Sequence, residues 1–293
     1  MEPPKLSPEP SPEPGLNGPH LWRHLLPVPR ADGHKHDRGH ALVFSGGPSS
    51  TGAARLAAGA ALRCGAGLVT LVAPGAAMQV AAGHLTAVML RRCDGAGELA
   101  GLVAATRARA AVIGPGFGLA GARADTLRAM VLALAKEDVS LVLDADALTA
   151  FQDDPPSLFD AIAARRAATV LTPHAGEYAR LFPDRPAVSQ AAVRSRSCII
   201  LKGARTLVAA PQGALLANAH ATPWLATAGS GDTLCGILAG FLAGGMAPFH
   251  AACAAVWVHG EAGRRCAPWL TAEDLEPALR PTLAALTGDG SAG

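Results

Sequence analysis

The sequence predicts an α/β protein with a mainly parallel central sheet and helices on both faces. From Ala41 onward, short apolar runs typical of buried strands alternate with helical stretches over most of the chain. Strands that alternate with helices form units whose connections place the helices on the two faces of a parallel sheet. Half of the 293 residues are hydrophobic and only 4% are aromatic, so we expect a core of Ala, Val, Leu and Ile.

The first thirty residues differ in composition from the rest. Residues 1–29 hold nine of the 23 prolines, including repeated PEP units. Such composition is typical of a disordered or polyproline-like segment. We therefore expect residues 1–30 to be a proline-rich tail or linker without ordered structure, and residues 31–293 to be a single domain.

Apolar runs and their flanking residues place the elements in order. A Ser/Thr-rich cap after the first strand leads into a helix that is closed by Gly65. Residues around Pro211 and Gly213 predict a hairpin at one edge of the sheet. The expected strands are residues 41–45, 68–73, 110–113, 139–143, 169–171, 198–201, 207–209 and 214–217.

Residues 233–260 contain no Asp, Glu, Lys or Arg and resemble a membrane span by hydropathy alone. Pro248 and the surrounding GGMAP divide this stretch into two shorter helices. We expect both helices to be buried in the core, and we expect no membrane partner.

Charge and cysteine usage narrow the classes of function. The formal net charge is +2, and the basic residues are scattered and include only four lysines, so no basic stripe indicates nucleic acid or anionic lipid. The six cysteines lie far apart with no CxxC pair, which is typical of reduced core residues. The N-terminus has no apolar run of a secretory signal, so we expect a cytoplasmic protein.

Polar or glycine-rich segments follow the strands at equivalent ends. They are GGPSSTGA, VIGPGFG, DADAL, TPHAGE and KGART, with AGSGD preceding a late helix. Ligands of open parallel sheets bind beyond the carboxyl ends of the strands. The six segments therefore predict one ligand-binding rim.

The segment ATAGSGDTLCGILAG, residues 226–240, predicts phosphoryl-transfer chemistry. A helix beginning near Gly231 directs unpaired backbone N–H groups at an anion above its first turn, and Gly229 and Gly231 let phosphate approach the backbone. Asp232 is placed to accept a proton from a substrate hydroxyl. The alternative is an ordinary glycine-rich loop in which Asp232 caps the helix.

Seven segments, in chain order, resemble the NAD(P)H-hydrate dehydratase family of the ribokinase-like superfamily. They are GGPSSTGAARLAAGAALRCGAGLVTLVAP, VIGPGFG, DADAL, TPHAGEYARL, ILKGARTLVAAPQG, AGSGDTLCGILAGFLAGG and AAVWVHGEAG. The resemblance covers about residues 33–280 and is specific because all seven motifs are in register. It implies a ribokinase-like fold and a lyase that repairs the S epimer of NADH or NADPH hydrate. Such enzymes phosphorylate the C6 hydroxyl and then eliminate phosphate. The motif set resembles bacterial members, which use ADP and release AMP, rather than eukaryotic members, which use ATP.

The resemblance also implies roles for individual residues. Asp232 is the catalytic base and contacts substrate, together with Ala53, Gly116 and His174. Mg²⁺ is the implied cofactor, held through water by Glu177 and Asp144. The nucleotide-binding residues are Lys202, Gly203, Ala204, Arg205, Thr206, Gly229, Ser230 and Gly231. We further expect a homotetramer and a functional link to an NAD(P)H-hydrate epimerase.

Several of these residues also have plain structural readings. Ala53 and Gly116 suit close helix packing, His174 and Asp146 suit helix caps, and Glu177 suits the first turn of a helix. Lys202 suits an ordinary charge at the rim. The sequence departs from the family pattern in reading GSGD for GTGD, and in having Ser50 where an aromatic residue often precedes TGA.

Three other functions stay open at this point. A Rossmann-type oxidoreductase is compatible with Gly116, Gly118 and Gly121 followed by Asp144, although it leaves AGSGD and TPHAGE unused. A vitamin-type kinase of the same superfamily shares the late nucleotide motifs but not the GGPSSTGA segment. A silent nucleotide-binding module needs the glycine loops but not Asp232.

Overall fold

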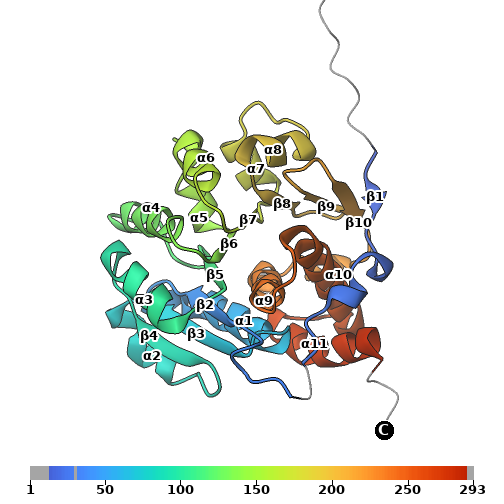
Figure 1. The fold of residues 1–293 in the computed structure, drawn as a ribbon, viewed down its shortest axis with the longest axis horizontal. Helices are drawn as coiled ribbons and strands as arrows, with labels where there is room; N and C mark the ends of the chain where they lie inside the picture. Colours follow the sequence, from blue (N-terminus) through green and yellow to red (C-terminus); the bar gives the residue numbers. More distant parts are fainter. Residues whose placement is uncertain (1–12, 30–31, 289–293) are drawn as a thin grey trace, which may run out of the picture.

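Ten strands form one sheet in the order β1-β10-β9-β8-β7-β6-β5-β2-β3-β4, within residues 13–29 and 32–288 that the computed structural model describes (Figure 1). All neighbouring strands pair in parallel except β9, which is antiparallel to β8 and β10. The strands are β1 Gly15–Leu16, β2 His40–Phe44, β3 Leu68–Ala73, β4 Met89–Arg92, β5 Ala110–Ile113, β6 Ser140–Leu143, β7 Thr169–Leu171, β8 Cys198–Leu201, β9 Thr206–Ala209 and β10 Leu215–Asn218. The predicted α/β class and its mainly parallel sheet are confirmed.

Each face of the sheet carries its own apolar core. Along β2, Val43 faces one core whereas Leu42 and Phe44 face the other, as the two-residue period of a strand requires. The first face is covered by α1 Thr51–Arg63, α2 Met78–Ala82, α9 Ser230–Ala243, α10 Pro248–Cys266 and α11 Ala272–Thr287 (Figure 1). The second is covered by α3 Leu99–Thr106, α4 Arg123–Leu134, α5 Asp146–Thr149, α6 Pro155–Ala163, α7 Ala175–Leu181 and α8 Val188–Ser195.

Small residues let α9 lie directly against α1. A Cβ atom on Gly236 would lie 2.1 Å from the carbonyl oxygen of Ala57, and one on Gly240 would lie 2.7 Å from that of Ala61. The two backbones are therefore closer than any larger side chain would allow. This contact fixes the position of α9, whose first turn contains Asp232.

The apolar stretch of residues 233–260 is divided as predicted. It lies in α9 and α10, which are separated at residues 244–247, and Pro248 begins α10. Over the part of the chain that the structure describes, none of the helices combines the length and apolar character needed to cross a membrane. All six cysteines are free thiols, and five of them are buried, as expected for reduced core residues.

The expectation of a disordered tail is wrong for residues 13–29. β1 pairs with β10, two short 3₁₀ turns follow at Pro19–Leu21 and Arg23–Leu25, and Trp22 is fully buried. One large aromatic side chain in the core stabilises the segment despite its prolines. The remainder of that expectation, for residues 1–12 and 30, lies outside the described residues.

Candidate functional site

The loops that follow β2 and β5 touch each other at the rim of the sheet. A Cβ atom on Gly46 would lie 1.9 Å from the carbonyl oxygen of Gly116. Gly116 has a φ of +60°, and its own Cβ would lie 3.1 Å from the Cβ of Ala53. The structure therefore brings together Ala53 and Gly116, the two small residues predicted to contact substrate.

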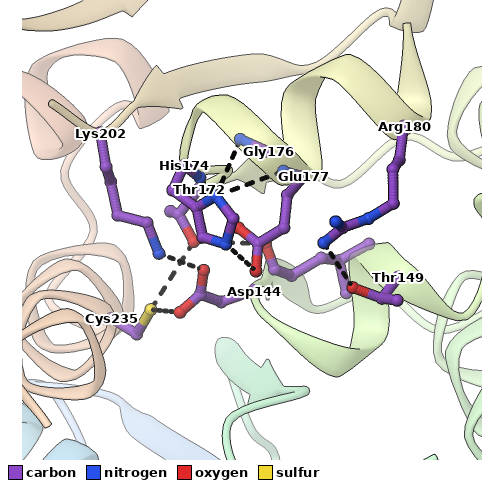
Figure 2. Close-up of polar contacts among 10 residues, drawn as sticks. Asp144, Thr149, Thr172, His174, Gly176, Glu177, Arg180, Lys202 and Cys235 are labelled. Atoms are coloured by element: carbon purple, nitrogen blue, oxygen red, sulfur yellow. Dashed lines mark hydrogen bonds and ion pairs between the residues drawn. The ribbon is translucent and has the colours of Figure 1, made fainter. Parts of the chain in front are cut away.

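Asp144 is at the centre of the polar cluster at this rim (Figure 2). It follows β6, is 2% exposed, and accepts a hydrogen bond of 2.6 Å from Lys202 Nζ at Oδ1. The Cys235 thiol donates to its Oδ2 at 3.3 Å. The next residue, Ala145, has a φ of 50°, a strained conformation for a residue with a side chain that is typical of functional sites.

Lys202 joins two of the predicted motifs. Its backbone N–H donates to the carbonyl of Pro173 at 2.8 Å, next to an isolated parallel bridge between His174 and Lys202. Burial lowers the pKa of Lys202, but the neighbouring charges, that of Asp144 foremost, outweigh burial and raise it. Lys202 is therefore a permanent cation between the TPHAGE and KGART segments.

His174 caps α7 and pairs with Glu177. The His174 Nδ1 atom accepts from the backbone N–H groups of Gly176 and Glu177, and Glu177 Oε2 accepts from the N–H of His174 at 2.8 Å. Because Nδ1 is an acceptor, Nε2 carries the proton and lies 3.4 Å from Glu177 Oε1. The capping role considered for His174 is confirmed, and half of its side chain remains exposed.

The first turn of α9 presents free donors beside this cluster. Gly229 precedes the helix with a φ of 85°, in the left-handed region that glycine favours. The backbone N–H groups of Gly231 and Asp232 have no acceptor among the described residues. Asp232 is the third residue of the helix and makes no capping bond, so the helix-cap alternative is wrong.

His259 of α10 holds the residue that begins α9. Its Nε2 lies 3.1 Å from Ser230 Oγ, and both residues are buried. Burial lowers the pKa of His259 to about 4, so the ring is neutral near pH 7. Because the ring is neutral, the positive end of the α9 helix dipole remains available to an anion, and His259 adds no charge that titrates near pH 7.

The pKa of Asp232 is shifted toward neutrality. Burial, followed by the charge of Asp144, raises the pKa of Asp232 to about 6, and Lys202 opposes the rise. A carboxylate with this pKa is mostly ionised at pH 7 and accepts a proton more readily than an ordinary Asp. The arrangement suits removal of a proton from a hydroxyl group next to the anion-binding turn.

A cavity of about 770 Å³ opens beside the same turn. It is bounded by the KGART segment, by the start of α9, by residues of α10 and by the irregular segment of residues 218–227. Of the predicted nucleotide-binding residues, the cavity is lined by Lys202, Gly203, Ala204, Thr206, Ser230 and Gly231. Arg205 and Gly229 are not among its lining residues, so their contact with nucleotide stays a prediction.

The sequence left several residues of this region unassigned. Cys235 lies one turn after Asp232 on α9, a spacing that places both on one side of the helix. Asp146, expected as a cap, accepts from the N–H of Gly118 at 2.7 Å and so ties VIGPGFG to DADAL. Residues 218–227 carry no recognisable motif, which is why their place in the cavity wall was missed.

The carboxylates predicted to hold a metal already have protein partners. Both oxygens of Asp144 accept hydrogen bonds, and both oxygens of Glu177 face His174. Within the described residues, no group of three or more His, Cys, Asp or Glu side chains is arranged to hold a metal ion. The donor set does not fit direct coordination of a resident metal by these residues.

Comparison with known proteins places this geometry in a family. The family model described as NAD(P)H-hydrate dehydratase matches residues 41–280. The ADP-dependent (S)-NAD(P)H-hydrate dehydratase of Xanthomonas campestris is 40% identical over 261 residues, which is 82% of this chain and 85% of that protein. The chain spans about half the length of the bifunctional NAD(P)H-hydrate repair enzymes that it also matches.

Solved structures agree on the fold. The ADP/ATP-dependent NAD(P)H-hydrate dehydratase of Bacillus subtilis, co-crystallised with ATP and Mg²⁺, aligns with a TM-score of 0.81 at 27% identity, over 94% of this chain and 99% of that one. A ribokinase-like superfamily protein of Enterococcus faecalis aligns with a TM-score of 0.79 at 24% identity, over 93% of this chain and 96% of that one. The predicted ribokinase-like fold is confirmed.

Proposed function

Because the chain belongs to the NAD(P)H-hydrate dehydratase family, we propose that it is an ADP-dependent lyase that restores NADH and NADPH from the S epimers of their hydrates. The observation that carries the proposal is the position of Asp232. Its carboxylate lies in the first turn of α9, beside free backbone N–H groups and the Asp144–Lys202 pair. This is the arrangement that transfer of a phosphoryl group to a hydroxyl requires.

The reaction has two balanced steps. The C6 oxygen of the hydrate bonds to the terminal phosphorus of ADP, the bond to the bridging oxygen breaks, and AMP leaves. The hydroxyl proton goes to Asp232. The C6–O bond then breaks and phosphate leaves with its electron pair, while the C5 proton passes to water and the C5–H electrons form the ring double bond. Asp232 returns its own proton to water before the next turnover. Phosphate is a far better leaving group than hydroxide, so phosphorylation makes the dehydration easy.

The residues of the chain bind and orient the two substrates and neutralise phosphate charge. The N–H groups of Gly231 and Asp232 and the cation of Lys202 compensate the negative charge that moves during phosphoryl transfer. The cavity of about 770 Å³ is large enough for a nucleoside diphosphate. Ala53 and Gly116, which lie against each other at the rim, are the residues that we expect to contact the dinucleotide.

The proposal is tested with purified protein, chemically prepared NADH hydrate, and either ADP or ATP. We expect the dihydronicotinamide absorbance to return with both nucleotides and faster with ADP. Recovery without any phosphoryl donor would indicate another kind of enzyme, and nucleotide binding without recovery would indicate a silent module. A kinase acting on vitamin precursors would leave the hydrate unchanged. A clear preference for ATP would refute only the proposed preference for ADP and would leave the proposed dehydratase activity in place.

The pKa of Asp232 predicts the acid side of the pH profile. A base must be ionised, so kcat/KM should be constant well above the raised pKa of about 6 and fall about tenfold per pH unit below it. Rates are measured over about pH 4.5–8.5, with far-UV circular dichroism at each pH to show that the protein stays folded. A profile that stays flat to about pH 5 would contradict the assigned base.

We propose that Mg²⁺ accompanies the nucleotide rather than occupying a resident site of protein ligands. Support comes from the Bacillus subtilis dehydratase, which was co-crystallised with ATP and Mg²⁺, and from the engaged state of Asp144 and Glu177. Excess EDTA should abolish turnover and added Mg²⁺ should restore it. Glu177→Gln should raise the Mg²⁺ concentration needed for half-maximal rate if Glu177 acts through water. Full turnover in EDTA would remove Mg²⁺ from the account.

Other attributes stay predictions. The bifunctional names of longer relatives support a functional link to an epimerase, which would supply the S epimer that the proposed lyase consumes. The homotetramer and the cytoplasmic location rest on the sequence analysis.

A further inference from the structure

The N-terminal segment is joined to the nucleotide cavity through Asn17. We call residues 15–22 the N-terminal brace. The Asn17 side chain is 5% exposed, and its Nδ2 donates to Asn218 Oδ1 at 3.0 Å and to the carbonyl of Cys253 at 2.8 Å. Its Oδ1 accepts from Trp22 Nε1 at 3.1 Å. The two Nδ2 donations join the brace to β10 and α10, and the bond to Oδ1 holds Trp22 in place within the brace.

Asn218 is the point at which the brace reaches the cavity. It is 2% exposed, ends β10 and contributes to the cavity wall. Its Nδ2 donates to the carbonyl of His220 at 3.0 Å. Because one end of the Asn218 amide holds the wall and the other end holds Asn17, the conformation of residues 218–220 depends on the brace.

An aromatic stack makes a second connection. The rings of Trp22 and Trp257 lie 5.8 Å apart, and Trp257 stacks on His220 with centroids 4.5 Å apart and planes 5° from parallel. His220 is in turn bonded to Glu261 of α10 at 2.8 Å. The brace therefore supports His220 through Trp22 as well as through Asn17.

The wall between β10 and α9 needs such support. We call residues 218–227 the cavity wall segment. After β10 ends at Asn218, its regular structure in the described chain is limited to a single 3₁₀ turn at Pro223–Leu225. Loops without backbone ladders hold their position through side-chain anchors and local packing. The first part of the cavity wall segment is anchored at Asn218 and His220, whereas Trp224 near its end packs against Trp269.

We propose that the N-terminal brace sets the position of the cavity wall segment, and that Asn17 is a positioning residue for the bound nucleotide that acts through Asn218. The inference rests on the proposed function in taking ADP as the occupant of the cavity. The brace precedes the residues matched by the family model, 41–280. It therefore adds a nucleotide-affinity determinant outside that match.

The test combines kinetics, binding and hydrogen exchange on the full chain. Asn17→Ala should raise KM and Kd for ADP about tenfold and change kcat by less than about twofold. Without the bond from Asn17, part of the binding free energy of ADP is used to order the cavity wall segment. Backbone amides of residues 218–227 should exchange faster in this variant. Trp22→Phe keeps a ring but loses the donor, so it should raise KM about two- to threefold.

A matched control separates position from stability. Ile162 of α6 is buried in the core on the other face of the sheet. Ile162→Ala should lower Tm and leave both KM for ADP and the exchange of residues 218–227 unchanged. In the Asn218→Ala background, Asn17→Ala should add less than about twofold to KM, because the contact through which it acts is gone.

The outcomes distinguish the brace from the proposed function. If Asn17→Ala changes neither the affinity for ADP nor the hydrogen exchange of residues 218–227, the proposed role of the brace is wrong. If that variant does not fold, the same readouts in Trp22→Phe decide. A wild-type protein that binds no ADP would refute the proposed function, whereas the exchange comparison would still test whether the brace holds the wall.

Discussion

Replacing Asp232 by Asn should lower turnover by about 10²- to 10⁴-fold, the contribution typical of a general base. The amide keeps the size and the helical position of the carboxylate but cannot accept the proton of the C6 hydroxyl. Affinity for ADP should stay equal or improve, because a negative charge leaves the phosphate site. Turnover with NADH hydrate and ADP binding by calorimetry are measured on the same preparation.

Asp125 supplies a matched control. It occupies the third position of α4, as Asp232 does in α9, but it is exposed and belongs to none of the motifs assigned to the site. Asp125→Asn should therefore leave turnover unchanged. Near-normal turnover in Asp232→Asn would end the assignment of Asp232 as the base.

Asp232→Asn should also be more stable than the wild type at pH values above the raised pKa of Asp232. Asp232 has a pKa of about 6 in the folded state against an ordinary value of 3.8, so ionisation of the folded protein costs free energy as the pH rises through this window. The decrease in the free energy of unfolding is complete above about pH 6. Asn cannot ionise, so Asp232→Asn should have a free energy of unfolding higher by about 1–3 kcal/mol near pH 8. The gain should disappear as the pH falls toward about 4. Thermal unfolding at both pH values checks it.

The second large effect is expected from Lys202→Met. Asp144 is nearly fully buried, with 3% of its side chain exposed, and Lys202 is its ion-pair partner. Among the described residues, removing the cation leaves the buried carboxylate with only the Cys235 thiol as a hydrogen-bond donor, at a cost of about 3–5 kcal/mol. Tm should fall by on the order of 10 °C, and KM for ADP should rise because the cation beside Gly231 is lost.

A second substitution tests this cause. Adding Asp144→Asn removes the unpaired charge and should restore most of the lost Tm, while turnover stays low. As a control, Arg92→Met breaks the exposed Arg92–Asp94 pair and should change Tm little. If Lys202→Met is as stable as the wild type, or if the double variant is no more stable than the single, the Asp144–Lys202 pair does not stabilise the site as described.

Most of the sheet was predictable because its strands are apolar runs bounded by glycine and polar loops. The strand at residues 89–92 was missed because MLRR forms an exposed edge strand, whose side chains show no buried pattern. The docking of residues 13–29 was missed for a different reason. Proline content dominates that segment, whereas its order depends on the distant partners of two residues, Asn17 with Asn218 and Trp22 with Trp257.

The candidate site was predictable where chemistry follows from strand ends. Ala53 beside Gly116, and Lys202 beside Asp144 and Gly231, meet as the convergence of motifs implied. Local sequence could not give the engagement of Asp144 by Cys235 or the closing of the cavity by residues 218–227. Both depend on contacts between segments far apart in the chain, and neither leaves a periodic pattern or a motif.

The central claim is that dehydration proceeds through phosphoryl transfer from ADP, and the stoichiometry of products tests it most directly. NADH hydrate and ADP are incubated with the protein, and NADH, AMP and phosphate are quantified over the same time course. The account predicts one AMP and one phosphate for each NADH restored, with no AMP formed when hydrate is omitted. Restoration of NADH without AMP, or AMP formed at the same rate without hydrate, would contradict it.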